Sequence, residues 1–256
     1  MAGGKRVGIT LRAPDFRLYV DCLRNAITDR TRLILLNSPH NPTGAVLSRD
    51  ELEAIAAVAR ERDLVVVADE VYDQLAYDAD RPHVSIATLP GMAERTLAVG
   101  SAGKTFSVTG WKVGWVTGPA ALVDSVRAVK QFLTYVSGAP LQPAVAVGLG
   151  LPQAYFDDFR SSLAARRDQL SDGLAALGFE VHRSRGTYFV TTDVRSVGYD
   201  DGVAFCRDLP SRAEVVAIPH AVFWDHLEIG RPLVRWAFCK RPEVIDEALA
   251  RLRKAF

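Results

Sequence analysis

Polar side chains follow three apolar, strand-like segments of the chain, each close to the point where the segment ends. The residues concerned are Asn41 after segment 33–36, Asp69 and Tyr72 after segment 64–68, and Ser101 and Lys104 after segment 96–99. An open parallel sheet binds ligands in the crevice outside the carboxyl ends of its strands. If these strands are neighbours, an amide, a carboxylate, a phenol, a hydroxyl and an amine meet in one cleft. Such groups serve acid–base and nucleophilic catalysis.

Each residue by itself also has an ordinary structural interpretation. An aspartate after a strand is usually a cap or turn residue, and a Ser–Lys pair in a glycine-rich loop is usually solvated. Their joint placement at the same end of successive strands favours a site. Residues 103–105, Gly-Lys-Thr, resemble the end of a phosphate-binding P-loop. That motif requires glycine at position 98, which is Ala98, and a following helix that residues 106–111 do not favour.

The first part of the chain alternates strand-like and helix-like segments, which predicts an α/β fold with a mostly parallel sheet flanked by helices. Strands are expected at residues 7–11, 33–36, 64–68, 96–99 and 114–117, and helices at 19–27, 48–59 and 122–129. Segments 33–36 and 64–68 are apolar without alternation, as in strands buried on both faces. Ser48 and Glu51 form a predicted capping box at the start of the second helix.

The second part predicts a smaller α+β domain. Apolar residues recur at helical spacing from 156 to 177, and Gly178 follows as a typical residue after a helix end. Further strands are expected at 179–182, 188–192, 215–218 and 233–238, and helices at 202–208 and 243–255. We therefore predict a first domain over residues 1–155 and a second over residues 156–256.

Composition narrows the class of protein. The 256 residues include 31 basic and 30 acidic side chains, so the net charge gives no reason to expect a nucleic-acid or membrane partner. No apolar run is long enough for a spanning helix or a signal peptide. Cys22, Cys206 and Cys239 are widely spaced, which favours neither disulfides nor zinc. These features predict a cytoplasmic globular protein without a bound metal.

Three motifs together resemble class I aminotransferases, the fold type I enzymes that depend on pyridoxal 5′-phosphate. They are Asn-Pro-Thr-Gly at 41–44, Ala-Asp-Glu-Val-Tyr at 68–72, and Gly-Ser-Ala-Gly-Lys-Thr-Phe-Ser-Val-Thr-Gly-Trp-Lys-Val-Gly-Trp at 100–115. Within that family, the chain is most similar to the kynurenine/glutamine aminotransferases and to N-succinyldiaminopimelate aminotransferases. The resemblance extends over essentially the whole chain.

The resemblance implies a role for each motif residue. Lys104 would form the Schiff base with the cofactor and later carry the substrate proton, while Asp69 would pair with the pyridinium nitrogen. Tyr72 and Asn41 would hydrogen-bond the cofactor 3′-oxygen, and Asn41 would also contact substrate. The phosphate would be held by Ser101 and Lys112.

At position 112 the family usually has arginine, so a point charge would replace a bidentate fork. Arg235 would bind the substrate α-carboxylate. Its simpler interpretation is a surface salt bridge, but the apolar neighbours Leu233, Val234 and Trp236 favour a partly buried arginine that needs an anion. His40, His220 and the cysteines are interpreted as structural, and Phe223 and Trp224 as possible pocket walls.

The family pattern contains an upstream segment that this sequence does not match, so the chain resembles a member without its N-terminal third. We expect exposed strand edges, weak cofactor binding and poor solubility of this chain by itself. The expected activity is transfer of an amino group between an amino acid and a 2-oxo acid, by a homodimer in the full-length form. Alternatives are a weakly active or non-catalytic remnant, or a cysteine-conjugate β-lyase that uses the same site.

Overall fold

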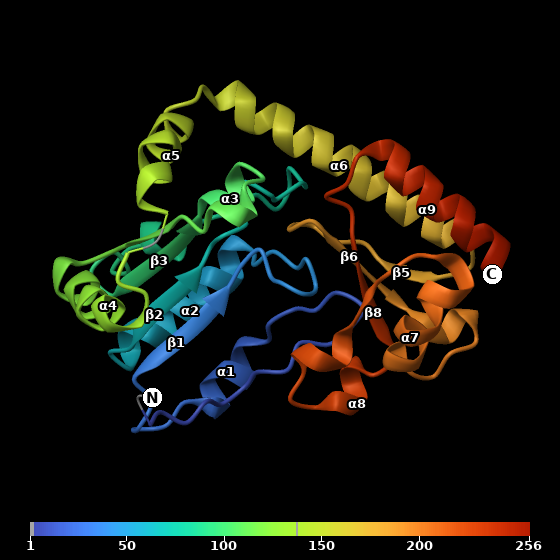
Figure 1. The fold of residues 1–256 in the computed structure, drawn as a ribbon. Helices are drawn as coiled ribbons and strands as arrows, with labels where there is room; N and C mark the ends of the chain where they lie inside the picture. The colour runs from blue at the N-terminus through green and yellow to red at the C-terminus, as the bar shows by residue number, and fades with distance from the viewer. Residues whose placement is uncertain (1–2, 137) are drawn as a thin grey trace. The chain divides into compact units, whose positions relative to one another are not determined.

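The computed structural model describes residues 3–136 and 138–256, which form two compact units (Figure 1). The N-terminal unit comprises residues 19–39 and 46–159, and the C-terminal unit comprises residues up to 18, 40–45 and 160–256. The division falls inside a long helix, between Phe159 and Arg160. The domain boundary predicted between residues 155 and 156 stays a prediction.

The N-terminal unit is built on a four-stranded sheet of order β1-β2-β3-β4. Its strands are β1 (Leu33–Asn37), β2 (Val65–Asp69), β3 (Thr96–Ser101) and β4 (Gly114–Thr117). β1, β2 and β3 are parallel, whereas β4 is antiparallel to β3. The predicted α/β fold with a mostly parallel sheet is therefore confirmed. Within the described residues, β1 and β4 are the end strands of this sheet.

The N-terminal unit also contains five α-helices among its described residues. They are α1 (Val20–Ala26), α2 (Arg49–Glu61), α3 (Ala102–Thr105), α4 (Ala120–Leu133) and α5 (Gln142–Leu149). The capping box that opens α2 is confirmed, because Ser48 Oγ accepts from the Glu51 N–H while Glu51 Oε2 accepts from the Ser48 N–H. The expected helix at 122–129 is also present as part of α4, but α3 and α5 were not predicted. The glycine-rich and proline-containing segments around α3 and α5 give weak helical signals.

Two expectations about strands in the first part of the sequence are wrong. Residues 33–36 do form a strand, but its burial alternates, with Leu33 51% and Leu35 69% exposed while Ile34 and Leu36 are buried. One face of β1 and β2 therefore packs inward and the other does not, so an apolar run did not indicate burial on both faces. Residues 7–11 form no strand, because no described strand pairs with them.

The C-terminal unit contains an antiparallel sheet of order β5-β6-β8-β7. Its strands are β5 (Glu180–His182), β6 (Phe189–Asp193), β7 (Ile218–Pro219) and β8 (Leu233–Ala237). Its helices are α7 (Gly202–Ala213), the unpredicted α8 (Leu227–Gly230) and α9 (Pro242–Ala255), together with most of α6 (Gln153–Ala176). Three of the four strands expected here are present, whereas β7 overlaps the strand expected at 215–218 only at Ile218. The long helix is also confirmed, and Gly178 follows it with φ +87°.

The core of the C-terminal unit contains a cluster of edge-on aromatic rings. Phe179 contacts both Phe205 and Trp236 at centroid distances of 5.9 and 5.8 Å. Trp236 donates its indole N–H to Thr192 Oγ1 at 2.8 Å, which satisfies the polar end of a buried ring. This packing fixes β8 against β6, and Arg235 lies between the buried residues Val234 and Trp236. None of the described helices is long and apolar enough to span a bilayer.

Candidate active site

In the N-terminal unit, the carboxyl ends of β1, β2 and β3 bring polar groups to one edge of the sheet. Asn37, Asp69 and Val99 are register partners across the three strands. The side-chain amide of Asn37 donates to the Asp69 carbonyl at 3.0 Å. Asp69 is the last residue of β2, so its carboxylate is placed by a strand rather than by a loop. A group held by a regular element is positioned more precisely than a group on a flexible segment.

Ser101, Lys104 and Lys112 belong to the connection between β3 and β4. Ser101 is paired in register with Gly114, and the Ala102 N–H donates to the Val113 carbonyl at 3.1 Å. The chain therefore leaves the sheet edge after Ser101 and returns to the same edge two residues after Lys112. Lys104 lies in the single turn of α3, and Lys112 ends the following 3₁₀ turn with φ +55°. The structure thus brings the predicted amine and both predicted phosphate contacts into one loop.

Close backbone contacts keep this loop compact. A Cβ atom at Gly103 would lie 2.9 Å from the Thr109 Cα, so only glycine fits there without movement. The Thr109 hydroxyl also donates to the Gly103 carbonyl, and the Thr105 hydroxyl donates to the Ser101 carbonyl, each at 3.1 Å. The turn that carries Lys104 is therefore fixed at both ends.

Tyr72 lies in the turn that follows Asp69 and is only 3% exposed. The backbone bonds from the Asp73 N–H to the Glu70 carbonyl and from the Leu75 N–H to the Tyr72 carbonyl define this turn. A phenol buried this close to the strand end has its ring fixed by packing. Its place after β2 agrees with the predicted arrangement.

The Asp69 carboxyl has a perturbed acidity. Partial burial raises its pKa, and a hydrogen bond from the Val71 N–H together with the positive charge of Lys104 opposes that effect. Lys104 therefore acts electrostatically on Asp69 in this unit. A carboxylate and an amine that influence each other at a strand end are typical of a functional site.

In the C-terminal unit, the side chains of Arg235 and Asn41 form a direct hydrogen bond. Arg235 Nη1 donates to Asn41 Oδ1 at 2.6 Å. The guanidinium carbon also lies 3.9 Å from the centre of the Phe189 ring and 4.6 Å from that of Phe223. Two aromatic rings and one amide therefore hold a cation in a defined orientation.

The loop that carries Asn41 is closed by its own backbone. The His40 N–H donates to the Ala45 carbonyl at 2.8 Å, and the Gly44 N–H donates to the His40 carbonyl at 2.7 Å. The Gly44 carbonyl accepts from the N–H groups of Arg185 and Gly186 at 3.0 and 2.8 Å. The loop is thereby attached to the segment just before β6.

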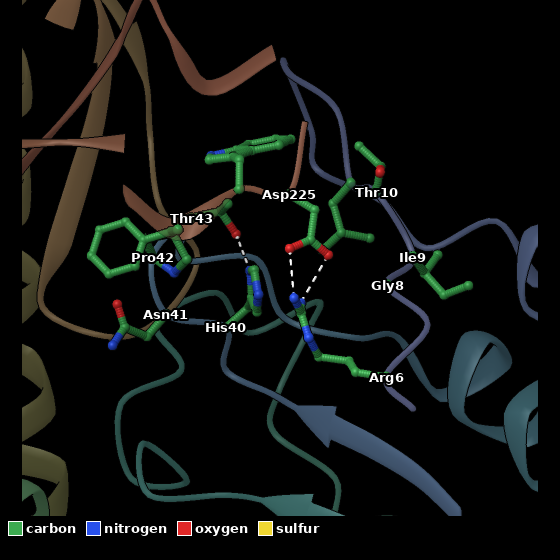
Figure 2. A pocket seen from close by; sticks show the side chains of 12 residues that line it. Arg6, Gly8, Ile9, Thr10, His40, Asn41, Pro42, Thr43 and Asp225 are labelled. Carbon is green, nitrogen blue, oxygen red and sulfur yellow. Dashed lines mark hydrogen bonds and ion pairs between the residues drawn. The ribbon is translucent and has the colours of Figure 1, made fainter. Parts of the chain in front are cut away.

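A pocket of about 240 Å³ lies beside this pair in the C-terminal unit (Figure 2). Asn41, Phe223 and Trp224 line it, so the predicted aromatic walls do border a cavity. Arg6 points toward Asp225 and forms a bidentate ion pair with it, with Nη1–Oδ2 and Nη2–Oδ1 distances of 2.8 and 2.7 Å (Figure 2). His40 lies deeper, with Nδ1 2.7 Å from the Thr43 hydroxyl. Burial lowers the pKa of His40 to about 4, so it is neutral at physiological pH.

His220, which the sequence analysis interpreted as a structural residue, lies in the interior of the C-terminal unit. It is fully buried, and its ring nitrogens contact Thr191 and Trp224. The sequence offered only its position beside Pro219, which suggests a loop rather than an interior. Cys206 is half-buried, and burial raises the pKa of its thiol to about 12, whereas Cys22 and Cys239 are exposed. No group of three metal-ligating side chains occurs among the described residues.

Comparison with known proteins decides the family. The family model for aminotransferase class I and II matches residues 1–252. This chain belongs to the class I and II aminotransferase family. A probable N-succinyldiaminopimelate aminotransferase of Mycobacterium tuberculosis is 51% identical over 98% of this chain and 66% of its own length. A kynurenine–oxoglutarate transaminase of Dictyostelium discoideum is 37% identical over 91% of this chain and 58% of its own.

Solved structures agree with that assignment. The N-succinyldiaminopimelate aminotransferase of M. tuberculosis superposes with a TM-score of 0.91 and 51% identity, over 94% of this chain and 62% of the other. The chain thus spans about two thirds or less of the length of these relatives. The resemblance found from the three motifs is confirmed at the level of family and fold.

The class I and II aminotransferases use pyridoxal 5′-phosphate, and the donor set of this chain fits that group. An acidic side chain at a strand end suits the pyridine nitrogen, and a lysine amine nearby suits the aldehyde. A serine hydroxyl and a lysine ammonium in one compact loop suit a phosphate. All these groups lie in the N-terminal unit, where the loop between β3 and β4 brings Ser101 and Lys112 to the same sheet edge.

Proposed function

We propose that this chain carries the cofactor and substrate residues of a pyridoxal-phosphate-dependent aminotransferase. The reaction moves an amino group from an amino acid to a 2-oxo acid. The observation that carries the proposal is the convergence of Asp69, Ser101, Lys104 and Lys112 at the carboxyl edge of one sheet. Family membership supports it.

Each residue of the N-terminal unit has a distinct task. The bound cofactor supplies an electron sink for the bond that breaks at the substrate Cα. Asp69 would pair with the ring nitrogen and keep a positive charge there. Lys104 would hold the cofactor by its amine and would carry the proton to and from the substrate Cα. Tyr72 would donate a hydrogen bond to the cofactor 3′-oxygen, and Ser101 and Lys112 would hold the phosphate.

Arg235 and Asn41 form the substrate part of the site. The Arg235 guanidinium binds the α-carboxylate through two parallel hydrogen bonds, and Asn41 sets the guanidinium orientation from one side. The Phe189 and Phe223 rings restrict the arginine and keep water from its faces. Asn41 also contacts the cofactor 3′-oxygen in this proposal.

Relatives suggest the substrate. The greater identity to a probable N-succinyldiaminopimelate aminotransferase than to a kynurenine–oxoglutarate transaminase makes N-succinyldiaminopimelate the first candidate donor. Kynurenine and glutamine are the next candidates, with 2-oxoglutarate as the acceptor. Conversion of the bound cofactor to its amine form by each donor, followed spectroscopically, separates these choices. No conversion by any amino acid would contradict the enzymatic proposal.

We also infer that the working form is a cytoplasmic homodimer. Three free cysteines suit a reducing compartment. The end of α4 and the residues after it expose Phe132, Leu133 and Tyr135 at 87%, 76% and 74%, which is unusual for a solvated helix end. Analytical ultracentrifugation of the cofactor-loaded protein tests the dimer.

The decisive test of the function concerns Lys104. Purified protein given the cofactor is expected to develop the visible absorbance of a lysine-bound cofactor, and Lys104→Ala is expected to lose it. Lys130→Ala, at an exposed lysine of α4 in the same unit, is the matched control. Retention of the band in Lys104→Ala would remove Lys104 from this role.

A further inference from the structure

His220 occupies an enclosed position in the C-terminal unit and makes two polar contacts. It begins a short 3₁₀ turn, His220–Phe223, that directly follows β7. Its Nε2 lies 3.0 Å from the Thr191 hydroxyl, and the Trp224 indole N–H donates to its Nδ1 at 3.4 Å. Both His220 and Thr191 are fully buried. The ring therefore has a polar partner at each nitrogen and no solvent-exposed surface.

These contacts determine which nitrogen carries the proton. An indole N–H can only donate, so Nδ1 of His220 must accept and carries no hydrogen. The remaining nitrogen, Nε2, carries the proton of the neutral ring and donates to Thr191 Oγ1. Burial lowers the pKa of His220 to about 3, and the positive charge of Arg235 acts in the same direction. The neutral tautomer with hydrogen on Nε2 is thus the form that this network requires.

Thr191 connects this ring to the strand that carries Arg235. Thr191 and Arg235 are register partners in the antiparallel pair β6–β8, so their side chains lie on the same face of the sheet. Phe189, two residues before Thr191, lies on that face too and stacks under the guanidinium at 3.9 Å. His220 thus hydrogen-bonds the residue opposite Arg235.

Phe223 provides a second connection on the other side of the guanidinium. The Phe223 and His220 rings meet edge-to-face with centroids 6.1 Å apart. Phe223 in turn lies 4.6 Å from the Arg235 guanidinium carbon. Because the turn is only four residues long, a shift of the imidazole would move Phe223 with it.

We propose that His220 is a positioning residue for Arg235, held as the Nε2–H tautomer between Trp224 and Thr191 so that Phe223 and β6 fix the guanidinium. His220 touches neither substrate nor cofactor in this proposal. It rests on the proposed function, because the role of Arg235 as the carboxylate-binding group is part of that function. In this proposal a buried histidine sets the orientation of Arg235, the cation that binds the substrate.

Nuclear magnetic resonance tests the proposal without any turnover. In ¹⁵N-labelled full chain at neutral pH, the His220 ring is expected to show a protonated Nε2 and an unprotonated Nδ1. The Arg235 Nε–H resonance, assigned by its loss in Arg235→Lys, is expected to be sharp in the wild type and broadened in His220→Leu. His226→Leu, a change at a histidine whose side chain is 62% exposed, should leave that resonance unchanged. A sharp Arg235 signal in folded His220→Leu, or a protonated Nδ1, would overturn the proposal.

Kinetics of the cofactor-loaded protein provide a second readout. His220→Leu is expected to lower kcat/KM for an amino acid by about tenfold or more, since small misplacement of a binding group is costly. The effect should appear mainly in KM, and an amine without a carboxylate should react almost as with the wild type. His220→Gln, which keeps a donor near Nε2, should recover most of the loss, and equal losses for both substrates would overturn the proposal.

Further variants separate this inference from the proposed function and from simple misfolding. If His220→Leu does not fold, Thr191→Val removes the acceptor with almost no change in volume and is expected to broaden the Arg235 signal likewise. An unchanged signal in Thr191→Val would overturn the proposal. If the wild type converts no amino acid, the proposed function fails, and the resonance of Arg235 still decides whether His220 orients it.

Discussion

Arg235 Nη1 donates a 2.6 Å hydrogen bond to Asn41 Oδ1, although the two residues are 194 positions apart in the sequence. The bond fixes the orientation of the Asn41 amide, because its oxygen faces the guanidinium and its nitrogen must face away. The Asn-Pro-Thr-Gly motif and Arg235, which the sequence analysis identified separately, are therefore joined by a hydrogen bond. Removing either side chain leaves the other without a short, charge-assisted bond.

Truncation of Arg235 is the most direct test of the substrate site. We expect Arg235→Ala to lower kcat/KM for an amino acid. The loss corresponds to about 2–5 kcal/mol of transition-state stabilisation, the cost of removing one member of a desolvated charge pair. An amine substrate without a carboxylate should be nearly insensitive to the change. The measurement is the rate of the half-reaction with each substrate, followed spectroscopically.

A suitable control is Arg231→Ala, which removes an arginine of the same unit whose side chain is 62% exposed. It should affect neither substrate. Equal losses for the two substrates in Arg235→Ala would make Arg235 a structural residue instead.

Gly44 is expected to be the most sensitive position of the loop that carries Asn41. Its φ is +74°, and a Cβ there would lie 2.2 Å from the Ser184 Cβ and 3.0 Å from the Gly186 carbonyl oxygen. Gly44→Ala should lower the free energy of unfolding by about 3 kcal/mol through backbone strain and overlap together. Urea denaturation followed by circular dichroism measures the change.

Gly198 provides the matched comparison. It has φ +86°, but a Cβ there would meet nothing within 4 Å. Gly198→Ala should therefore show only the conformational penalty, about 1 kcal/mol. Equal effects of the two substitutions would mean that the contact with Ser184 contributes nothing.

Much of this arrangement could be predicted from the sequence, for identifiable reasons. Helical spacing and the reciprocal Ser48–Glu51 cap mark α2 because both depend on residues a few positions apart. The loop from 100 to 115 is recognisable because close backbone approaches at positions such as Gly103 allow only glycine. Features that depend on residues close together in the chain can therefore be predicted from the sequence.

Other features depend on contacts that the local sequence does not encode. The apolar run in β1 does not say whether a second layer covers Leu33 and Leu35, which the structure leaves exposed. The segment 7–11 has strand-like composition but no described partner strand. The buried His220 forms a hydrogen bond with Thr191, 29 positions away, and the sequence around Pro219 carries no sign of this contact.

Acid is expected to destabilise the fold through its buried histidines. Burial lowers the pKa of His220 to about 3 and that of His40 to about 4 in the folded chain, whereas an unfolded histidine titrates near 6.5. Between these values the unfolded chain binds protons that the folded chain does not. Stability is therefore fully present above about pH 6.5 and falls as the pH decreases toward 3.

The measurement is the free energy of unfolding in urea at pH 7.5 and pH 5, a range above the titration of most carboxylates. Each of the two histidines should lower the free energy of unfolding by about 2 kcal/mol between pH 7.5 and pH 5. His220→Gln should reduce the difference, and His226→Gln, at an exposed histidine, should not. Asp69, whose pKa is raised by burial, opposes the trend at the acid end. A pH-independent free energy of unfolding would contradict the assignment of both histidines as neutral.

Lys112 offers a substitution that is expected to strengthen cofactor binding. It lies in the compact loop between β3 and β4 with φ +55°, and in the proposed function its ammonium would present a point charge to the cofactor phosphate. An arginine there could donate two parallel hydrogen bonds to phosphate oxygens, and the backbone strain would be the same because both residues carry a Cβ. Lys112→Arg should therefore lower the Kd for pyridoxal 5′-phosphate severalfold.

Lys112→Ala should raise this Kd by about tenfold or more, since a hydrogen bond to a charged group contributes about 1.5–3 kcal/mol. Titration of the cofactor-free protein measures both, with Lys130→Arg on α4 as the control that should change nothing. Wild-type affinity in Lys112→Ala would show that this loop does not hold the phosphate.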